Sequence, residues 1–352
     1  MISFFRKIRQ KLFSQNRITR YLLYALGEIF LVVIGILIAL QVNNWNEERN
    51  NFKKTEQLLI EIQKDLSNDY SEIGYSSDFY QLKDSLALLF LSDTVFDLNP
   101  NHFTNRSIQK IGKGSFPVTI SNQSFRNLDD NREIIPEQFK EIVRSLGLFY
   151  TERISQFESV SGNLLTIEKN LDQYLAQQPG YIAMQRDSIT QENLEFYLQD
   201  PIFKNFVFKY HQAIEEYQVI GSILQNKVIA INQIINEILV FEKNQSLDPL
   251  LQITYTKKEL EEYTGSYISN SGSDTIYIFD YHGLLAGRSS ENREIYEEFF
   301  VLEKIGEDSV RSIGFEQDLA YFIRNEEREV EAIKNYWSNR ESFIISKKLK
   351  NK

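Results

Sequence analysis

The stretch YLLYALGEIFLVVIGILIALQV, residues 21–42, decides the architecture of this chain of 352 residues. It contains one charged side chain, Glu28, among 22 residues. An α-helix rises about 1.5 Å per residue, so the stretch is roughly 33 Å long and matches a bilayer core of about 30 Å. We therefore predict a transmembrane helix over residues 21–42, with the lipid bilayer as its partner.

The flanking residues predict the direction of this helix. Residues 1–20 carry six Lys or Arg and no acid, whereas residues 43–62 carry three basic and four acidic residues. Basic residues next to a span are retained in the cytoplasm, so the N-terminus is expected inside and the body outside. Residues 1–20 then form a basic cytoplasmic or interfacial segment. A cleaved signal peptide is the alternative, but the stretch ends without an A-x-A site, which favours an uncleaved anchor.

The composition argues against several functional classes. The net charge is −10, although residues 1–20 are basic, so the body is a poor candidate for binding nucleic acid or anionic lipid heads. The chain has no cysteine, which excludes a disulfide scaffold, thiol catalysis and Cys-based metal sites. The body must therefore fold around its own apolar core, and it is long enough to do so.

Residues 21–49, YLLYALGEIFLVVIGILIALQVNNWNEER, resemble the N-terminal signature of a family of uncharacterised single-span envelope proteins of Bacteroidetes-type bacteria. The matching positions are Tyr21, Tyr24, Gly27, Glu28, Gly35, Ala39, Gln41, Asn43, Asn44 and Trp45. The resemblance implies a place in the bacterial inner membrane, a periplasmic body and long helices. It implies no reaction.

A helical region is predicted over residues 43–250. From Asn46 to about Leu91 the apolar residues keep helical spacing in two sets, with a weak point expected between them at Gly74. The first set is Leu59, Ile62, Leu66 and Ile73, and the second is Phe79, Leu82, Leu86 and Leu89. Residues 92–136 are polar and turn-rich, with one short helix expected at residues 123–129.

Two heptad patterns follow, each with apolar or aromatic residues in nine of ten positions. The first is Val143, Leu146, Tyr150, Arg153, Phe157, Val160, Leu164, Ile167, Leu171 and Tyr174, and the second is Val207, Tyr210, Ile214, Tyr217, Gly221, Leu224, Val228, Ile231, Ile235 and Ile238. We predict an antiparallel pair of helices, coiled-coil-like, that forms a bundle with the preceding helix. We favour packing of these apolar faces against each other within one chain. The alternative is that they form an interface in a homo-oligomer or with a partner membrane protein.

Strand signals dominate residues 253–349, where β-branched and aromatic stretches are separated by short polar turns. We predict a small antiparallel β-meander or barrel, which makes the fold class α+β. LEEYTGSYI, with Leu260, Tyr263, Gly265 and Tyr267, resembles the start of the β-rich appendage that follows serine-hydrolase domains in bacterial envelope proteins. That appendage is not the catalytic part, so no activity is implied. The aromatic residues expected to form the core are Tyr263, Tyr267, Tyr277, Phe279, Phe299, Phe300, Phe315 and Phe322.

No catalytic, cofactor-binding or metal-ligating residue is predicted. The three histidines, His102, His211 and His282, lack the spacing of a zinc site. No nucleophile elbow or phosphate-binding loop occurs. The acid pairs at residues 129–130 and 326–327 are expected to be solvated. A carboxylate pair formed only in three dimensions remains open.

Glu28 lies about 9 Å inside the predicted span, where a carboxylate is costly. Gly35 and Ala39 follow at spacings of seven and four, on the same helical face. This face predicts either association with another span or passive anchoring, with proton chemistry less favoured. Trp45 is predicted to be an interfacial anchor.

These features predict a non-enzymatic, single-pass membrane protein that acts as a scaffold or as a subunit of a membrane complex. The alternative is an extracytoplasmic sensor that binds a small ligand or peptide in the β-module or in a groove of the bundle. A carboxylate-based hydrolase comes third. A cavity of about 300 Å³ or more in the β-module would favour the sensor.

Overall fold

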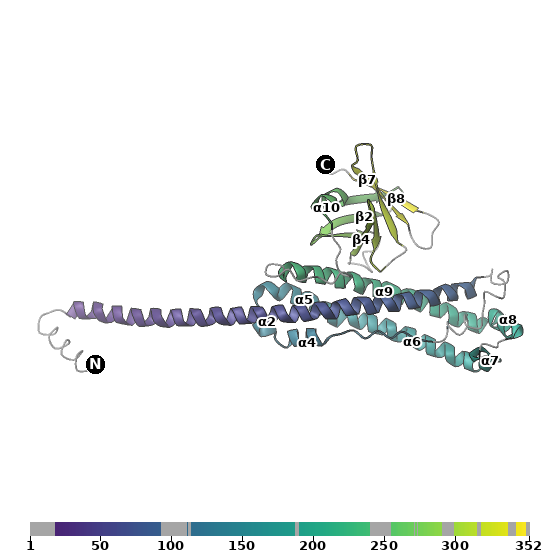
Figure 1. Ribbon diagram of the computed structural model, residues 1–352, viewed down its shortest axis with the longest axis horizontal. Helices are drawn as coiled ribbons and strands as arrows, with labels where there is room; N and C mark the ends of the chain where they lie inside the picture. The colour runs from purple at the N-terminus through teal and green to yellow at the C-terminus, as the bar shows by residue number, and fades with distance from the viewer. Residues whose placement is uncertain are drawn as a thin grey trace. The chain divides into compact units, whose positions relative to one another are not determined.

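The computed structural model describes residues 18–92, 111, 114–186, 190–239, 255–270, 272, 274–290, 299–314, 318–336 and 343–349. They form an α+β chain with a long N-terminal apolar helix, further helices and a C-terminal barrel, as predicted (Figure 1). The chain divides into two compact units: Met1–Gln57 with Asn131–Gln138, and Leu58–Asp130 with Phe139–Lys352. The predicted basic segment and the predicted boundary near residue 250 lie largely outside the described residues.

Helix α2 runs unbroken from Ile18 to Leu91, so one helix contains both the predicted span and the first helix of the bundle. Its N-terminal part is long and apolar enough to cross a membrane. The weak point predicted at Gly74 is wrong. The small residues there allow close packing: Ser76 Oγ lies 2.6 Å from the Tyr217 hydroxyl, and a Cβ on Gly74 would lie 3.2 Å from the Gln225 amide.

From Leu59 onward α2 keeps one line of buried positions at alternating spacings of three and four. The line is Leu59, Ile62, Leu66, Asp69, Ile73, Ser76, Tyr80, Lys83, Ala87 and Phe90. The second predicted apolar set is therefore on the wrong face, and its Leu82 is 58% exposed. The prediction followed hydrophobicity, whereas the buried line continues through three polar residues spaced seven apart. We call Asp69, Ser76 and Lys83 the polar line of α2.

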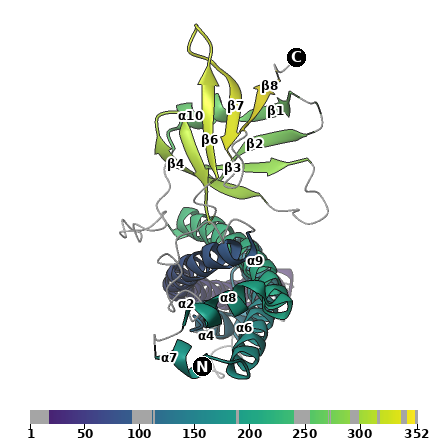
Figure 2. The ribbon, with the colours of Figure 1, turned by 90° about the vertical axis from the view of Figure 1, so that its right-hand side faces the viewer.

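Helices α2, α6 (Ile154–Ala176) and α9 (Pro201–Leu239) form the bundle, seen nearly end-on in Figure 2. α6 and α9 are antiparallel, as predicted, because Phe157 packs against Tyr217 while Glu168 bonds Tyr210. The shorter helices are α4 (Gln123–Asp129), α5 (Lys140–Leu148), α7 (Tyr181–Gln185) and α8 (Gln191–Gln199). The helix predicted at residues 123–129 is thus confirmed.

The heptad patterns hold with one systematic departure. Every position of the second pattern is buried except Ile238, which is half-buried. In the first pattern a π-helical turn, Phe149–Arg153, precedes α6 and adds a residue to the repeat. At three positions burial lies one residue further along the chain, at Ile154, Glu168 and Leu175 in place of Arg153, Ile167 and Tyr174, whereas the other apolar positions of the pattern in α6 are buried as predicted.

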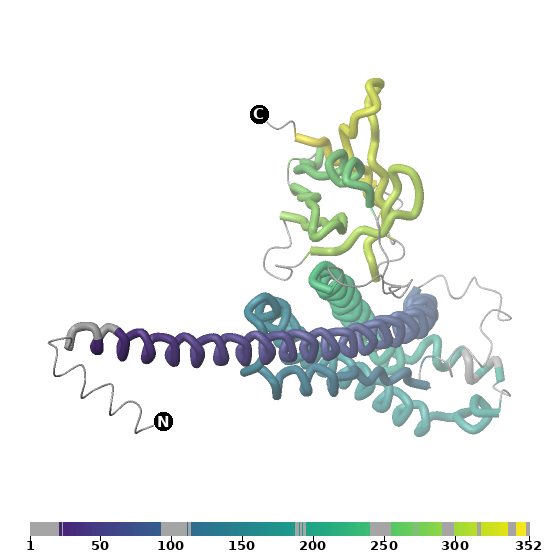
Figure 3. Tube along the Cα trace, turned by 60° about the vertical axis from the view of Figure 1, so that its left-hand side comes forward, coloured from purple at the N-terminus to yellow at the C-terminus, as the bar shows by residue number. Residues whose placement is uncertain are grey.

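The C-terminal strands form one closed antiparallel barrel in chain order, with β1 paired to β8. They occupy the green-to-yellow part of the chain trace in Figure 3. The strands are β1 Gly265–Ser269, β2 Thr275–Tyr281, β3 Leu284–Ser289, β4 Phe300–Gly306, β5 Ser309–Ser312, β6 Leu319–Arg324, β7 Val330–Tyr336 and β8 Phe343–Lys348. The predicted barrel is confirmed. A helix not predicted, α10 (Lys257–Tyr263), precedes it, and its signal was the capping box in which Thr256 and Glu259 bond each other's backbone N–H.

Candidate functional site: the barrel cavity

The antiparallel order gives the barrel two different ends. The end at which β1, β3, β5 and β7 begin is closed by α10. There Tyr263 stacks on Phe322 with ring centroids 4.1 Å apart, and the Tyr267 hydroxyl donates to the Tyr263 carbonyl at 2.6 Å. Leu260, Tyr263 and Tyr267 all belong to the buried core. The motif that suggested an appendage is therefore a plug for one end of the barrel.

An ion network reinforces this closed end. The Arg324 guanidinium donates to both carboxylate oxygens of Asp308 at 2.7 Å, and to Glu262 of α10 at 2.8 Å. The hydrogen bonds from Arg324 lower the pKa of both carboxyl groups. This network joins α10 to the β4–β5 and β6–β7 hairpins. Each of its charged groups, Arg324, Asp308 and Glu262, is paired with a group of opposite charge.

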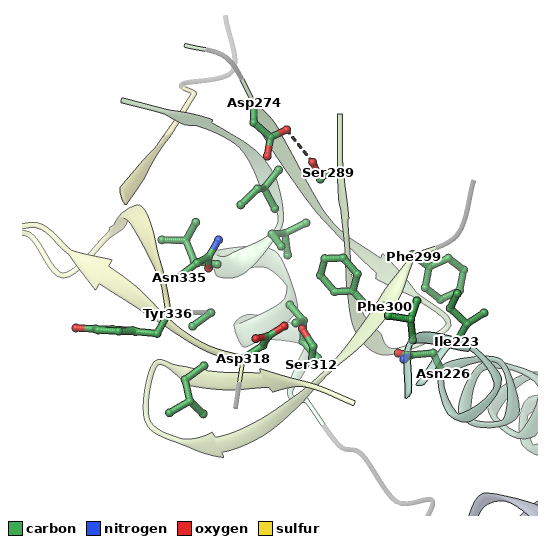
Figure 4. Close-up of a pocket in the computed structure, with 17 residues that line it drawn as sticks. Ile223, Asn226, Asp274, Ser289, Phe299, Phe300, Ser312, Asp318, Asn335 and Tyr336 are labelled. Atoms are coloured by element: carbon green, nitrogen blue, oxygen red, sulfur yellow. Dashed lines mark hydrogen bonds between the residues drawn. The ribbon is translucent and has the colours of Figure 1, made fainter. Parts of the chain in front are cut away.

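The opposite end of the barrel opens into a cavity of about 270 Å³ (Figure 4). Its body is apolar, and its polar groups come from positions where strands begin or end and, in the case of Asn226, from helix α9. The apolar lining is Val219, Ile223, Ile276, Ile278, Phe299, Phe300, Leu302, Leu319, Ala320 and Ile333, and the polar lining is Asn226, Asp274, Ser289, Ser312, Asp318, Asn335 and Tyr336. The size is just below the usual lower limit for ligand pockets, and a closed eight-stranded barrel is just wide enough to hold one small ligand.

Asp274 is the best-oriented polar group of the lining. Its Oδ1 accepts hydrogen bonds from Ser289 Oγ at 2.8 Å and from the backbone N–H and Oγ of Ser290 at 3.2 and 2.8 Å. These donors hold the carboxylate at the start of β2, and its other oxygen points toward the apolar lining (Figure 4). Asp318 adds a second carboxylate where β6 begins.

Helix α9 supplies one wall of the cavity. Asn226 donates to the Ile313 carbonyl at 2.9 Å and accepts from the Val301 N–H at 2.5 Å, so it pairs with two barrel segments. Ser222 Oγ donates to the Gly314 carbonyl at 2.8 Å. Gly314 has φ +78°, and a Cβ there would lie 2.7 Å from Ser222. The close approach of α9 therefore depends on glycine at this position.

The prediction that the barrel aromatics form the core is only partly correct. Tyr263, Tyr267 and Phe322 are core residues, but Phe299 and Phe300 line the cavity. The side chains of Tyr277 and Phe279 alternate with that of buried Ile278, and Arg288 lies over both rings. Phe315 lies outside the described residues. The aromatics thus split among core, cavity wall and outer face, which composition does not reveal.

The residues predicted for membrane association lie on one face of α2, as their spacing requires. Glu28, Gly35 and Ala39 are all exposed, and a Cβ on Gly35 would meet no atom within 4 Å. Trp45, the predicted interfacial anchor, is 61% exposed. Association through this face stays a prediction.

The described histidines lie beside carboxylates, and His211 faces a second one, since its Nε2 lies 3.6 Å from Glu215. His211 Nδ1 lies 2.6 Å from Asp84, and His282, in the β2–β3 turn, lies 2.6 Å from Glu237 of α9. His102 lies outside the described residues. Among the residues that the structure describes, no group of three or more His, Asp or Glu is arranged to hold a metal ion.

Sequence reasoning missed a second polar cluster, in the core of the bundle. Lys83 of α2 lies 2.8 Å from Glu168 of α6, which also accepts from the Tyr210 hydroxyl at 2.7 Å. Burial lowers the pKa of Lys83 and raises that of Tyr210. An acid in the interior of a helix, next to an apolar heptad position, was the available signal, but only packing shows that it is buried.

The polar line of α2 also holds the extended segment 114–121. Lys83 donates to the Gly114 carbonyl, Ser76 Oγ donates to the Phe116 carbonyl at 3.2 Å, and Asp69 Oδ1 accepts from the Ser121 N–H at 3.0 Å. The other carboxylate oxygen of Asp69 and the hydroxyl of Tyr150 are buried and have no partner among the described residues. Burial raises the pKa of Asp69 to about 7.

Comparison with known proteins finds a match for only part of the chain. Residues 28–98 match the model of a family of unknown function (DUF6090). The match covers most of the predicted span and the rest of α2, and it leaves the barrel and its cavity outside. No curated protein and no solved structure matches the chain. The function must therefore be argued from the cavity and the helix.

Proposed function

We propose that this protein is a non-enzymatic, single-pass protein of the bacterial inner membrane whose periplasmic barrel binds a small, largely apolar ligand. The observation that carries the proposal is the cavity of about 270 Å³ inside the closed barrel, apolar along its body and polar at one end. This combination is typical of small-molecule sites, in which apolar walls supply affinity and a few polar groups fix orientation.

The sequence favoured a scaffold over a sensor, and at about 270 Å³ the cavity falls just short of the size that would by itself favour the sensor. Its apolar body with polar groups at one end is nevertheless the arrangement of a small-ligand site, and for this reason we place ligand binding first. A barrel that served only as a scaffold has no need for an open interior, because filling it with side chains would add stability. The face that carries Glu28 with the small residues Gly35 and Ala39 supports a role in a membrane complex as the second candidate, because small residues let two spans approach closely. The two functions are compatible, since they use different parts of the chain.

Filling the cavity is expected to weaken ligand binding strongly. Ala320→Leu adds three carbons to the wall from β6, and we expect it to weaken binding of 2-phenylethanol by at least about tenfold through loss of space. Binding is measured by ligand-observed NMR on full-length protein in phosphatidylcholine nanodiscs, with empty nanodiscs subtracted. The control is Tyr321→Leu, the next residue on the same strand, which faces outward.

The result that overturns the binding function is absence of 2-phenylethanol binding to the natural protein, or equal binding by Ala320→Leu. The melting temperature of each unliganded variant is measured in parallel, so that loss of binding through unfolding is recognised.

The proposed membrane topology is supported by the apolar N-terminal part of α2 and by the basic residues 1–20. A reporter enzyme that is active only in the periplasm, fused after Lys352, is expected to be active. A reporter that is active only in the cytoplasm, fused at the same place, is expected to be inactive. The reverse pair of results would invert the topology.

A further inference from the structure

A short stretch of α9, residues 219–226, borders the barrel cavity on one side and packs against α2 on the other. Val219, Ile223 and Asn226 belong to the cavity lining, and Figure 4 shows Ile223 and Asn226 on the helix side of the cavity. Residues three or four apart lie on the same side of a helix, so these three side chains form one face that looks into the barrel.

Hydrogen bonds hold this stretch to the barrel next to the cavity. Ser222 Oγ donates to the Gly314 carbonyl at 2.8 Å, and the Asn226 side chain accepts from the Val301 N–H at 2.5 Å. Both side chains are buried, so water does not compete for these bonds. The α9 stretch is therefore fixed to the strand ends that surround the cavity.

The opposite side of the stretch packs on α2 without spare room. A Cβ on Gly221 would lie 3.3 Å from Ile73, and a Cβ on Gly74 would lie 3.2 Å from the Gln225 amide. The Gln225 amide also donates to the Tyr70 carbonyl of α2 at 3.2 Å. Gly221 and Gln225 are four residues apart and therefore form one face. α9 thus has close contacts on its α2 side and borders an open cavity on the other.

This asymmetry connects the cavity with α2. Side chains that border an open space lack packing partners on that side and lose the corresponding dispersion contacts. A ligand in the cavity supplies such contacts to Val219 and Ile223 and restricts the turn of α9 that carries them. Gly221 lies on this turn and packs closely on Ile73, so the restriction extends to α2, because closely packed interiors transmit strain.

We infer that residues 219–226 of α9 act as a coupling element, through which occupancy of the barrel cavity raises the local stability of α2 around Ile73. The inference rests on the proposed binding function and states what binding does to the rest of the chain. α2 runs unbroken from Ile18 to Leu91, so the helix that receives the effect also contains the apolar N-terminal part. Binding that rigidifies a protein couples two sites without a large structural change, and the coupling is reciprocal.

Hydrogen exchange of full-length protein in phosphatidylcholine nanodiscs, with and without 2-phenylethanol, tests the inference. At a ligand concentration of ten times Kd, we expect exchange in residues 219–226 and 70–76 to slow several-fold, up to a limit of about tenfold set by mass action. Helices α7 and α8 supply no residue to the cavity lining and should exchange at an unchanged rate. Ala320→Leu at the same ligand concentration should show no slowing, which controls for effects of the ligand on the lipid.

A glycine variant tests the coupling in the reverse direction. Gly221→Ala adds a methyl group between α9 and α2, outside the cavity lining, and displaces α9 toward the cavity because the α2 side has no spare room. We expect the affinity for 2-phenylethanol to fall at least about fivefold. The matched control is Gly162→Ala on α6, where a Cβ would meet no atom within 4 Å, and it should leave the affinity unchanged.

The outcomes separate the coupling from the binding function. If 2-phenylethanol binds but exchange in residues 70–76 does not slow, or slows equally in α8, the coupling is refuted and the binding function stands. Equal affinities of folded Gly221→Ala and Gly162→Ala refute the coupling as well. If the natural protein does not bind 2-phenylethanol, or if Ala320→Leu binds it equally well, the binding function fails and the coupling with it. Melting temperatures identify a variant that does not fold, and the exchange experiment on the natural protein decides without it.

Discussion

Replacing Glu168 with leucine is expected to destabilise the helical bundle by about 3–5 kcal/mol, because the substitution leaves the buried charge of Lys83 without its partner. Lys83 is 3% exposed and its Nζ lies 2.8 Å from Glu168, so water cannot replace the lost carboxylate without disrupting the core. The Tyr210 hydroxyl loses its acceptor as well. The measurement is urea unfolding of full-length protein in detergent, followed by far-UV circular dichroism, with hydrogen exchange to locate the loss in α6 and α9.

The double variant Lys83→Met with Glu168→Leu separates the charge from the packing. Removing both partners eliminates the uncompensated charge, so we expect it to recover at least half of the lost free energy of unfolding. Recovery is incomplete because Tyr210 and the Gly114 carbonyl lose hydrogen bonds that are worth about 1 kcal/mol each. Lys169→Ala, at an exposed position next to Glu168, should be nearly neutral. A double variant no more stable than Glu168→Leu would show that charge is not the cause.

The bundle is expected to become less stable as the pH rises from about 4 to about 7, through Asp69. Burial is the main cause that raises its pKa to about 7 from the ordinary value of 3.8, and the charges of Asp65 and Glu72 add to it, while the hydrogen bond from Ser121 opposes it. Within this window the folded chain keeps a proton that the unfolded chain has released, so the free energy of unfolding falls as the pH rises. The full loss is roughly 4 kcal/mol and is complete above about pH 7.

Asp69→Asn should remove this dependence. The asparagine keeps an oxygen for the Ser121 N–H and carries no charge at the buried position, so the variant should be more stable than the natural protein at pH 8. Urea midpoints at pH 5 and pH 8 measure the change. Glu61→Gln, at an exposed position of the same helix, is the control. An unchanged pH slope in Asp69→Asn would show that another group titrates.

The element types followed from local patterns, and the structure confirms them where packing agrees with hydrophobicity. The heptads of α9 and the alternating strands were predicted because each position repeats the same environment. α2 shows the limit of this approach. Its second apolar set, around Leu82, faces outward, because the buried line continues through Ser76 and Lys83. Buried polar side chains generally have hydrogen-bond partners, and here these partners come from distant segments of the chain. A single sequence does not show which residues those partners are.

The cavity shows the same limit in the barrel. The sequence predicted that the barrel aromatics form the core, but it does not distinguish an aromatic that fills the core from one that lines a cavity. Phe322 packs against Tyr263 of α10, whereas Phe300 faces open space at the other end. The difference arises because α10 closes only one end of the barrel. Its capping box, Thr256 with Glu259, was the one local signal for that plug.

The sequence by itself determined the apolar stretch of residues 21–42, the long helices and the succession of antiparallel strands, because each depends on interactions between residues close along the chain. Closure of the strands into a barrel needs the pairing of β1 with β8, which are distant in sequence. The tertiary structure alone decided which polar residues are buried, where the barrel is plugged and where it is open. Lys83 and Glu168 are 85 residues apart, and Asn226 reaches Val301 across 75 residues. Contacts over such separations depend on the packing of whole elements, and no local pattern encodes them.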